Sequence, residues 1–410
     1  MVDPTGLFLG RMTQNVLLAT TVAWPSAARL AGAFANLGCR VEAMFPRGHV
    51  LGVSRYVSRA HNYRPLAPRA SLAAALKAAK PDLIIPCDDR ALACLLSLHA
   101  AGHAPAETIA RSLGCVASYP SMMNRSRSIA IAREEGILAP LTIPVANDAE
   151  LAHGLEVIGL PAVLKTDGSW GGDGVVIAHT REEASAALRK LKGPPSRLRS
   201  LARIYKRADL HFLQDALRPK VATVHLQRFV EGRPATSAFA CRDGEVLAAL
   251  HMDVVDLQRA TGPASMLKRV DCPSMDDAAR RIAKRFRLSG LHGLDFVRDK
   301  KGAAHLIELN PRATQICHLA FGARADLPAA LLDLPPRPVA TDKTLIALFP
   351  QTWQRGAPEL RPATVYDDVP WDDPEVVRAS IGADLPDALA AGLEEIAHAS
   401  AVLLPRGSES

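Results

Sequence analysis

The first third of the chain alternates short apolar runs with stretches that have helical spacing. The apolar runs lie at residues 16–20, 40–45 and 82–86, and the helical stretches lie at residues 25–37, 71–79 and 89–99. Strands that are apolar throughout and separated by amphipathic helices are typical of a parallel sheet covered on both faces. The pattern therefore predicts a parallel α/β domain over residues 1–115.

From residue 116 onward the pattern changes to a mixture of helices and hairpin-forming strands. A helix is expected at 125–134, and strands are expected at 162–166, 174–178, 223–230, 236–241, 245–250, 293–298 and 304–309. Thr180 and Glu183 have the spacing of a capping box, which predicts a helix start. We expect an α+β domain over 116–325 and a small C-terminal extension over 326–410, where proline is frequent and the final PRGSES is expected to be disordered.

Composition places the chain among ordinary soluble globular proteins. Of its 410 residues, 48% are hydrophobic and 22% are charged, which excludes collagen, a coiled coil and wholesale disorder. The seven cysteines form no CxxC pair, a distribution that favours reduced thiols over disulfides or a zinc site. The apolar run at residues 16–24 is too short to span a bilayer, so we expect a cytoplasmic protein without a membrane partner.

The positive charge of the chain is concentrated in one segment. The net charge is +7, but ten Lys or Arg against only Asp209 and Asp215 give residues 189–220 alone a net charge of +8. A nucleic-acid-binding module would need aromatic side chains for stacking, and this stretch holds only Tyr205 and Phe212. We therefore expect a solvated basic surface and no nucleic-acid partner.

Residues 163–174 read VLKTDGSWGGDG and combine a lysine at a strand end with closely spaced glycines. Glycine allows backbone N–H groups to turn inward around phosphate oxygens, and the ammonium of Lys165 would add positive charge. The segment matches neither the GxxxxGK[ST] loop nor a strand–GxGxxG–helix unit, because it leads into another strand. From these residues alone, a phosphate-binding loop and a plain glycine-rich hairpin turn both remain open.

Residues 290–312, GLHGLDFVRDKKGAAHLIELNPR, predict a hairpin whose turn is DKKG. Glu308 and Asn310 are two residues apart on one strand, so their side chains point to the same face. Asp295 lies on the partner strand, and whether it shares that face depends on the length of the loop. Carboxylate and amide oxygens suit Mg²⁺, and Arg312 would place a cation beside a transferring phosphoryl group. The alternative is an exposed hairpin with solvated acidic side chains.

Together with HLQRFVEG at residues 225–232, these segments resemble, in order and separation, the ATP-grasp superfamily, which includes carboxylate–amine ligases, biotin carboxylase and carbamoyl-phosphate synthase. The resemblance covers residues 1–325, and its most specific parts are DFV…LIELNPR and KTDGSWGGDG. It implies a pre-ATP-grasp parallel α/β domain followed by two α+β subdomains that hold ATP between them. It also implies an ADP-forming ligase, in which a carboxylate is phosphorylated to an acyl phosphate and an amine attacks it to form a C–N bond.

The resemblance implies three groups of site residues. The ATP-binding group comprises Arg125, Lys165, Gly171, Gly172, Gly174, Gln227, Arg228, Val230 and Glu231. The metal-binding group, for one or two Mg²⁺ ions with Mn²⁺ as the alternative, comprises Asp295, Glu308 and Asn310. The catalytic residue is Arg312, which would stabilise the transition state that forms the acyl phosphate.

Within the ATP-binding group, the resemblance implies that Lys165 contacts the α- and β-phosphates and that the backbone of Arg228 and Val230, at the hinge between the subdomains, reads adenine. Two positions depart from the family pattern. Arg125 stands where the family has a lysine, which keeps a cation but changes its reach. An arginine and a proline follow Gly232, so the acidic ribose contact of many members is absent there or is supplied by Glu231.

The implied partners are small-molecule carboxylate and amine substrates, and a homodimer is left open. The alternatives to a ligase are an ATP-grasp kinase or carboxylase-type enzyme and a catalytically silent nucleotide-binding protein. The tail segment DVPWDDP at residues 368–374 has no ligand spacing for a metal and is expected to form a surface turn that packs on the ligase domain through Trp371.

Overall fold

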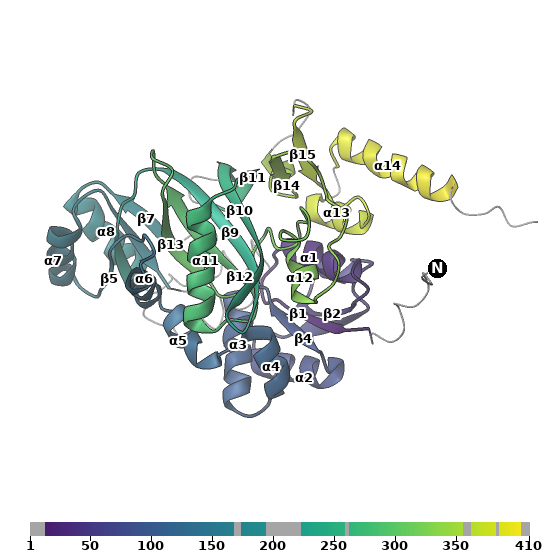
Figure 1. Ribbon diagram of the computed structural model, residues 1–410, viewed down its shortest axis with the longest axis horizontal. Helices are drawn as coiled ribbons and strands as arrows, with labels where there is room; N and C mark the ends of the chain where they lie inside the picture. The colour runs from purple at the N-terminus through teal and green to yellow at the C-terminus, as the bar shows by residue number, and fades with distance from the viewer. Residues whose placement is uncertain are drawn as a thin grey trace, which may run out of the picture.

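The computed structural model describes residues 13–167, 174–193, 223–258, 262–355, 362–382 and 385–402. Three β-sheets organise these residues: two of four strands and one of seven (Figure 1). Most of the predicted glycine loop, most of the basic stretch at 189–220 and the final PRGSES lie outside the described residues.

The first sheet is parallel, in the order β3-β2-β1-β4, and helices connect its strands. This confirms the parallel α/β fold expected near the N-terminus. The strand β3 was not expected, because it is a mostly polar and exposed edge strand without an apolar pattern. The elements are β1 (Asn15–Ala19), α1 (Ser26–Ala35), β2 (Arg40–Pro46), η1 (Val50–Gly52), β3 (Arg59–Tyr63), α2 (Pro68–Ala79), β4 (Leu83–Pro86) and α3 (Asp89–Ala100).

Short helices lead from the first sheet toward the second. Asn124 accepts a hydrogen bond from the N–H of Arg127 at 2.9 Å, so it caps the helix in which Arg125 is the first residue. That helix, α6, contacts the strand β13 of the large sheet. The elements are α4 (Ala106–Leu113), η2 (Val116–Ser118), α5 (Tyr119–Met122) and α6 (Arg125–Glu134).

The second sheet is small and antiparallel, in the order β5-β8-β6-β7. Thr180 accepts a hydrogen bond from the N–H of Glu183 at 3.1 Å, which confirms the predicted helix start. The elements are β5 (Thr142–Val145), α7 (Asp148–Ile158), β6 (Ala162–Thr166), β7 (Val175–Ala178), α8 (Arg181–Lys192) and β8 (Val224–Arg228). In Figure 1 this sheet and its two helices form a lobe at one end of the molecule.

The third sheet has the order β13-β12-β9-β10-β11-β14-β15 and is antiparallel except between β14 and β15. The helix α11 lies along it (Figure 1). The elements are β9 (Arg233–Arg242), β10 (Glu245–Leu257), β11 (Ala264–Arg269), α11 (Pro273–Phe286), β12 (Gly290–Arg298), β13 (Ala304–Asn310), β14 (Leu345–Leu348) and β15 (Val365–Asp368). A parallel α/β sheet followed by antiparallel α+β sheets confirms the fold class.

The first and third sheets share a continuous core, whereas the small sheet has its own. Leu17 and Ile84 of the first sheet belong to the same buried cluster as Phe239 and Leu294 of the third. The apolar side chains of the small sheet, with those of α7 and α8, form a separate cluster. The small sheet is therefore a distinct subdomain attached to a larger body, and polar side chains meet where the two join.

The C-terminal segment completes the large sheet instead of standing apart from it. It adds β14 and β15 at the sheet edge, and a small core around Trp353 and Leu389 buries its helices. The aspartates of DVPWDDP contact the first domain, since Ser54 donates to Asp373 at 2.5 Å and Tyr56 donates to Asp372 at 2.6 Å. The remaining elements are α12 (Leu327–Leu331), η3 (Trp353–Arg355), α13 (Pro374–Ile381) and α14 (Asp387–Val402).

Candidate active site between the small and large sheets

The hairpin β12–β13 places the two predicted metal carboxylates side by side. Asp295 pairs directly with Glu308 in the sheet, and Gly293 pairs with Asn310, so the three polar side chains share one face. Thr236, on the other neighbouring strand, also pairs with Asp295. The question that the sequence left open is therefore resolved in favour of a shared face.

A β-bulge at Ile307 joins the hairpin to the small sheet. The register passes from Asp295/Glu308 to Phe296/Leu306, which leaves Ile307 without a partner across the ladder. Its carbonyl instead accepts hydrogen bonds from Nζ of Lys165 and Nε2 of Gln227, each at 3.4 Å. The bulge thus brings Lys165 to the carboxylate face. Gln227 is buried, and its side chain also donates to Thr142 at 2.9 Å.

Lys165 is a buried lysine, with only 6% of its surface exposed. Burial lowers its pKa from 10.5 to about 8, the neighbouring Glu308 and Asp295 oppose that shift, and Arg125 adds to it. Among the described residues, the carbonyl of Ile307 is the acceptor within hydrogen-bonding distance of its ammonium. A buried cation with unused donors is suited to bind an anion.

Arg125 connects the start of α6 to both sheets. Its Nη1 lies 2.8 Å from Oε2 of Glu308, and its Nε lies 3.8 Å from Oδ1 of Asp167. Asp167 follows β6 directly and also lies 2.9 Å from Nε2 of His225, a fully buried residue of β8. An arginine, two carboxylates and a histidine therefore form one chain of polar contacts across the junction.

The carboxylate of Asp295 is held rigidly. It accepts a hydrogen bond from Oγ1 of Thr236 and another from Nδ2 of Asn310, both at 2.9 Å. Burial raises its pKa, the nearby charge of Glu308 raises it further, and the two hydrogen bonds oppose the shift. Two carboxylates at this separation, one of them buried, are an arrangement that a divalent cation would stabilise.

The oxygen ligands at this site suit Mg²⁺, which shares its coordination with phosphate, better than a metal ion that is coordinated by protein side chains alone. Among the described residues, no three His, Cys, Asp or Glu side chains gather into a metal-binding group. Two carboxylates and the amide oxygen of Asn310 would leave positions open on the ion. Mg²⁺ is usually bound in this way, by one or two carboxylates that share it with phosphate oxygens.

Arg312 lies at the edge of the first domain. Its Nε donates to Oδ1 of Asp89 at 2.8 Å, and its Nη2 donates to Oδ1 of Asn310 at 3.3 Å. The N–H of Ala313 donates to the carbonyl of Pro86, the last residue of β4, at 3.1 Å. Burial would lower the pKa of Arg312, but Asp89 raises it overall, so the guanidinium stays charged. The carboxyl end of the parallel strand β4 thus lies against the end of β13. Ligands usually bind at the carboxyl ends of parallel strands.

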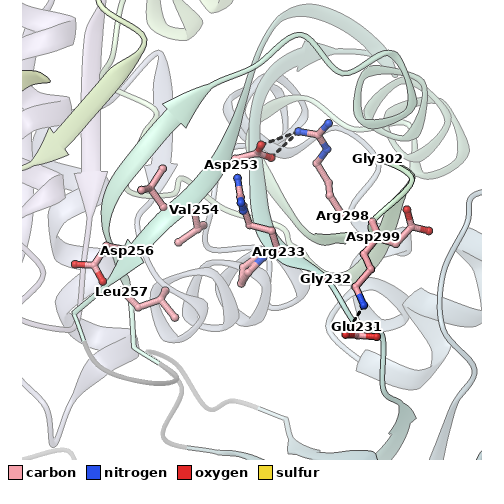
Figure 2. Close-up of a pocket in the computed structure, with 13 residues that line it drawn as sticks. Glu231, Gly232, Arg233, Asp253, Val254, Asp256, Leu257, Arg298, Asp299 and Gly302 are labelled. Atoms are coloured by element: carbon pink, nitrogen blue, oxygen red, sulfur yellow. Dashed lines mark hydrogen bonds and ion pairs between the residues drawn. The ribbon is translucent and has the colours of Figure 1, made fainter. Parts of the chain in front are cut away.

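Glu231, which follows the predicted hinge residues, lines a cavity of about 890 Å³ (Figure 2). Figure 2 shows the paired Arg298 and Asp253 on one side of it and Glu231 on the other. Arg298 donates to both oxygens of Asp253, at 2.7 and 2.8 Å. Gly232 is required by close packing, since a Cβ there would come within 2.2 Å of the carbonyl oxygen of Arg298. Neither Lys165 nor the carboxylate pair lines this cavity.

The other predicted nucleotide residues are placed as follows. The N–H of Arg228 donates to the carbonyl of Leu141 at 2.9 Å, so of its two backbone groups the carbonyl is the one left to read adenine. Glu231 is exposed and lies 2.8 Å from Nζ of Lys300. The carbonyl of Gly174 accepts from the N–H of Thr166 at 3.1 Å, which continues the β6–β7 hairpin. Gly171 and Gly172 lie outside the described residues.

Two aspartates that contact the arginines of this junction were not among the predicted site residues. Asp167 belongs to the quoted KTDGSWGGDG, but its contacts with Arg125 and His225 depend on the packing of α6 and β8 against β6. Asp89 is the other. It was not predicted because the sequence does not show that its side chain contacts Arg312. Asp88, next to it, caps α3 by accepting from the N–H of Ala91 at 2.9 Å.

Comparisons with known proteins agree with this architecture. The family model described as ATP-grasp domain matches residues 209–315. A search of curated proteins finds no match. None of the helices in the described ranges is both long enough and apolar enough to cross a membrane.

Solved structures of similar fold are distant in sequence. Carboxyaminoimidazole ribonucleotide synthase from Aspergillus clavatus, complexed with ATP, is 14% identical over 79% of this chain and 78% of its own, with a TM-score of 0.58. N5-carboxyaminoimidazole ribonucleotide synthetase from Thermus thermophilus is 18% identical over 78% and 79%, with a TM-score of 0.56.

A third similar structure is the biotin carboxylase domain of 2-oxoglutarate carboxylase from Hydrogenobacter thermophilus, a dimer in complex with MgADP, ADP and bicarbonate. It is 15% identical over 80% of this chain and 72% of its own, with a TM-score of 0.56. At these identities the three structures establish the shared fold.

Proposed function

The chain carries an ATP-grasp domain, and from that premise we propose that it is an ATP-dependent ligase that activates a carboxylate for attack by an amine. The observation that carries this proposal is the pairing of Asp295 with Glu308 on one sheet face, opposite the buried ammonium of Lys165. Burying two carboxylates and an ammonium near a sheet core is unfavourable unless ligands compensate their charges. A metal–nucleotide complex would do so, because the metal ion would bind the carboxylates and the phosphates would bind the ammonium.

In this proposal, Asp295, Glu308 and Asn310 hold Mg²⁺, and Lys165 and Arg125 bind the phosphates. Mg²⁺, when bound, neutralises phosphate charge and orients the phosphate chain for in-line transfer. The remaining groups act by position: Thr236 and Asn310 fix the carboxylate of Asp295 before any ligand arrives. Preorganised groups of this kind lower a barrier because they need not reorient during the reaction.

The adenosine end of the nucleotide is proposed to lie toward the hinge, where Gln227, Arg228, Val230 and Glu231 follow one another. Of these residues, Glu231 is the one that lines the cavity in Figure 2, which lies next to the proposed adenosine end of the site. Since the N–H of Arg228 is bonded to Leu141, we assign adenine recognition to the carbonyl of Arg228 and the N–H of Val230. The glycines of the β6–β7 hairpin, including Gly174, are proposed to cover the phosphates.

The acceptor carboxylate is proposed to bind at Arg312, between the end of β13 and the first domain. A carboxylate oxygen attacks the γ-phosphorus of ATP, the bond to the bridging oxygen breaks, and ADP leaves. The amine then attacks the carbonyl carbon of the acyl phosphate, inorganic phosphate leaves, and the amine loses a proton. Arg312 would stabilise negative charge on the acceptor and the transferring group in the first step.

Bicarbonate is a second candidate for the activated carboxyl group. One structure of similar fold contains bicarbonate beside MgADP, as its name states. The same residues would serve, because bicarbonate presents the same oxyanion to Arg312. Neither candidate requires a nucleic-acid partner, and a homodimer stays open.

The proposal is tested first by thermal melting of the full chain with ATP, with and without Mg²⁺. Nucleotide at a hundred times its dissociation constant should add about 2.7 kcal/mol of stability, and excess EDTA should remove most of the gain. Lys165→Ala should weaken nucleotide binding, whereas Lys301→Ala, in the exposed turn of the β12–β13 hairpin, should not. Equal stabilisation with and without Mg²⁺ would contradict the metal assignment.

The second test identifies the chemistry. Phosphate release from ATP is measured with pooled carboxylic acids and with bicarbonate, each with and without pooled amines. A ligase should release phosphate only when both an acceptor and an amine are present, apart from a slow background. Release that depends on the acceptor alone would favour a kinase or carboxylase-type enzyme, and nucleotide binding without any release would favour a silent nucleotide-binding protein.

A further inference from the structure

The guanidinium of Arg125 occupies a place that the proposed reaction assigns to a metal ion. Its Nη1 is 2.8 Å from Oε2 of Glu308, one of the two paired carboxylates. At the same time, the resemblance to the ATP-grasp superfamily assigns Arg125 to the nucleotide phosphates. One side chain cannot neutralise Glu308 and bind phosphate equally well in the same position.

A second contact keeps Arg125 near both positions. Its Nε is 3.8 Å from Oδ1 of Asp167, and its backbone N–H donates to the same oxygen at 3.4 Å. The other oxygen of Asp167 lies 2.9 Å from Nε2 of the buried His225. Because a guanidinium has five donors in a planar fork, one edge can stay on Asp167 while the other changes partner.

The charges around Glu308 explain why some cation must always be close. Asp295 lies directly across the ladder from Glu308. Lys165 is buried, and its ammonium donates to the carbonyl of Ile307 at 3.4 Å. Without Arg125 or a metal ion, Glu308 would lose the cation that contacts it directly and would still face a second carboxylate.

We propose that Arg125 exchanges partners: it neutralises Glu308 while the site holds neither metal nor nucleotide, and it moves to nucleotide phosphate when a divalent cation takes its place on Glu308. This deepens the proposed function and rests on it. Two consequences follow. The free protein binds divalent cations weakly, and metal and nucleotide each strengthen the binding of the other through Arg125.

A fixed structural ion pair is the competing interpretation, and the exposure of the carboxylate distinguishes the two. In a fixed pair the carboxylate would be expected to be buried, as that of Asp368 is, at 1% exposed, beside Arg29. The side chain of Glu308 is 25% exposed and that of Arg125 is 14% exposed. Arg127, two residues further along α6, offers a matched control, since it carries the same charge in a pair with Glu134 in which both side chains are 54% exposed.

The first experiment measures Mn²⁺ binding to the nucleotide-free full chain by electron paramagnetic resonance. Arg125→Gln should tighten Mn²⁺ binding on the order of fivefold, because the metal no longer competes with a guanidinium. Arg127→Gln removes the same charge from the same helix and should change the affinity by less than twofold. An unchanged affinity in Arg125→Gln, or an equal gain in both variants, would overturn the exchange.

The second experiment measures ATP binding in excess EDTA by isothermal titration calorimetry. Glu308→Gln releases Arg125 from its partner, so this variant should bind metal-free ATP more tightly than the wild type. Asp295→Asn removes a neighbouring negative charge without releasing Arg125 and should gain less. Equal gains in the two variants would mean that simple charge repulsion is responsible and that Arg125 does not exchange.

These measurements separate the inference from the proposed function. If the wild type binds no ATP under any condition, the proposed function fails, and the Mn²⁺ titration still decides whether Arg125 excludes metal from Glu308. If the wild type binds Mg²⁺–ATP tightly but the Arg125→Gln variant leaves Mn²⁺ binding unchanged, the exchange alone fails. Arg125→Lys keeps the charge and is expected to fold, so it should still exclude most Mn²⁺. A fivefold gain in Mn²⁺ affinity in this variant would also count against the exchange.

Discussion

Two ionic networks join distant parts of this molecule, and they are built differently. The first, the Glu308 cluster, comprises Arg125, Lys165, Asp295, Glu308 and Asn310 at the junction of the small and large sheets. The second, the Asp368 clasp, comprises Arg29, His318 and Asp368, where β15 meets the first domain. In the clasp, Asp368 is 1% exposed and accepts from Arg29 at 2.5 Å and from His318 at 2.7 Å.

The two buried aspartates of these networks have opposite pKa directions. Burial would raise the pKa of Asp368, but Arg29 and His318 more than compensate and lower it. For Asp295, burial and the charge of Glu308 raise the pKa, and two neutral hydrogen bonds do not offset them. The clasp pairs its buried carboxylate directly with the guanidinium of Arg29, whereas in the cluster Asp295 accepts from two neutral donors and Lys165 donates to a carbonyl oxygen. Saturation of buried charge therefore distinguishes a structural network from a binding site.

The largest expected effect is on the clasp. Asp368→Ala leaves the guanidinium of Arg29 poorly solvated without its carboxylate, and this should cost about 3–5 kcal/mol of unfolding free energy. Chemical denaturation of the full chain measures the loss. As a control, Asp372→Ala removes an exposed acceptor of the Tyr56 hydroxyl and should cost about 1 kcal/mol or less. A small loss in Asp368→Ala would mean that the clasp is not a structural network.

For the Glu308 cluster we expect the opposite: a substitution should cost much activity and little stability. Glu308→Gln keeps size and one oxygen, so the hairpin should survive and stability should change by about 1 kcal/mol or less. Turnover should fall a hundredfold or more, a barrier increase of roughly 3 kcal/mol, because one preorganised metal carboxylate is lost. The Mg²⁺ concentration for half-maximal activity should also rise. Phosphate release against Mg²⁺ concentration measures both, and unchanged kinetics would contradict the metal assignment.

The sequence was sufficient to predict elements whose apolar pattern and capping residues agree. The helix at Arg125–Glu134 and the strand at Ala162–Thr166 have the predicted bounds. The helix Asp148–Ile158 was missed although Asn147 and Glu150 have capping spacing, and Asn147 does accept from the N–H of Glu150 at 2.8 Å. The apolar residues Leu151, Leu155 and Ile158, which follow at helical spacing, were a further signal for this helix.

The site could be predicted only as separate segments. Lys165, Asp295 and Glu308 were identified by residue type and spacing, but whether they meet depends on a register and on the bulge at Ile307. A bulge is set by the packing of neighbouring strands and has no sequence signal of its own here. The partners Asp89 and Asp167 come from other elements, so only the tertiary fold brings them to Arg312 and Arg125.

The buried ammonium of Lys165 also predicts a pH dependence of nucleotide binding. Burial lowers the pKa of Lys165 to about 8 in the free protein, and a bound phosphate would raise it again. Binding above pH 8 therefore takes up a proton, so the dissociation constant should rise about tenfold per pH unit there until the pKa of the complex is reached. Lys165→Met should bind weakly at every pH without this dependence. A wild-type affinity that is flat from pH 7 to pH 9.5 would contradict the role of Lys165.

The ion pair between Arg312 and Asp89 is intermediate between the Asp368 clasp and the Glu308 cluster. A substitution in it should have the smallest effect on turnover and stability. Its side chains are 17% and 35% exposed, so it is neither as buried as the clasp nor free of protein partners. If Asp89 positions Arg312 for the acceptor, Asp89→Asn should lower turnover on the order of tenfold, leave nucleotide affinity unchanged and cost about 1 kcal/mol or less of stability. Asp89→Glu should recover part of the turnover, because the charge returns. Steady-state kinetics and denaturation of the same preparations decide the matter: a clear loss of stability with normal turnover would place this pair with the Asp368 clasp.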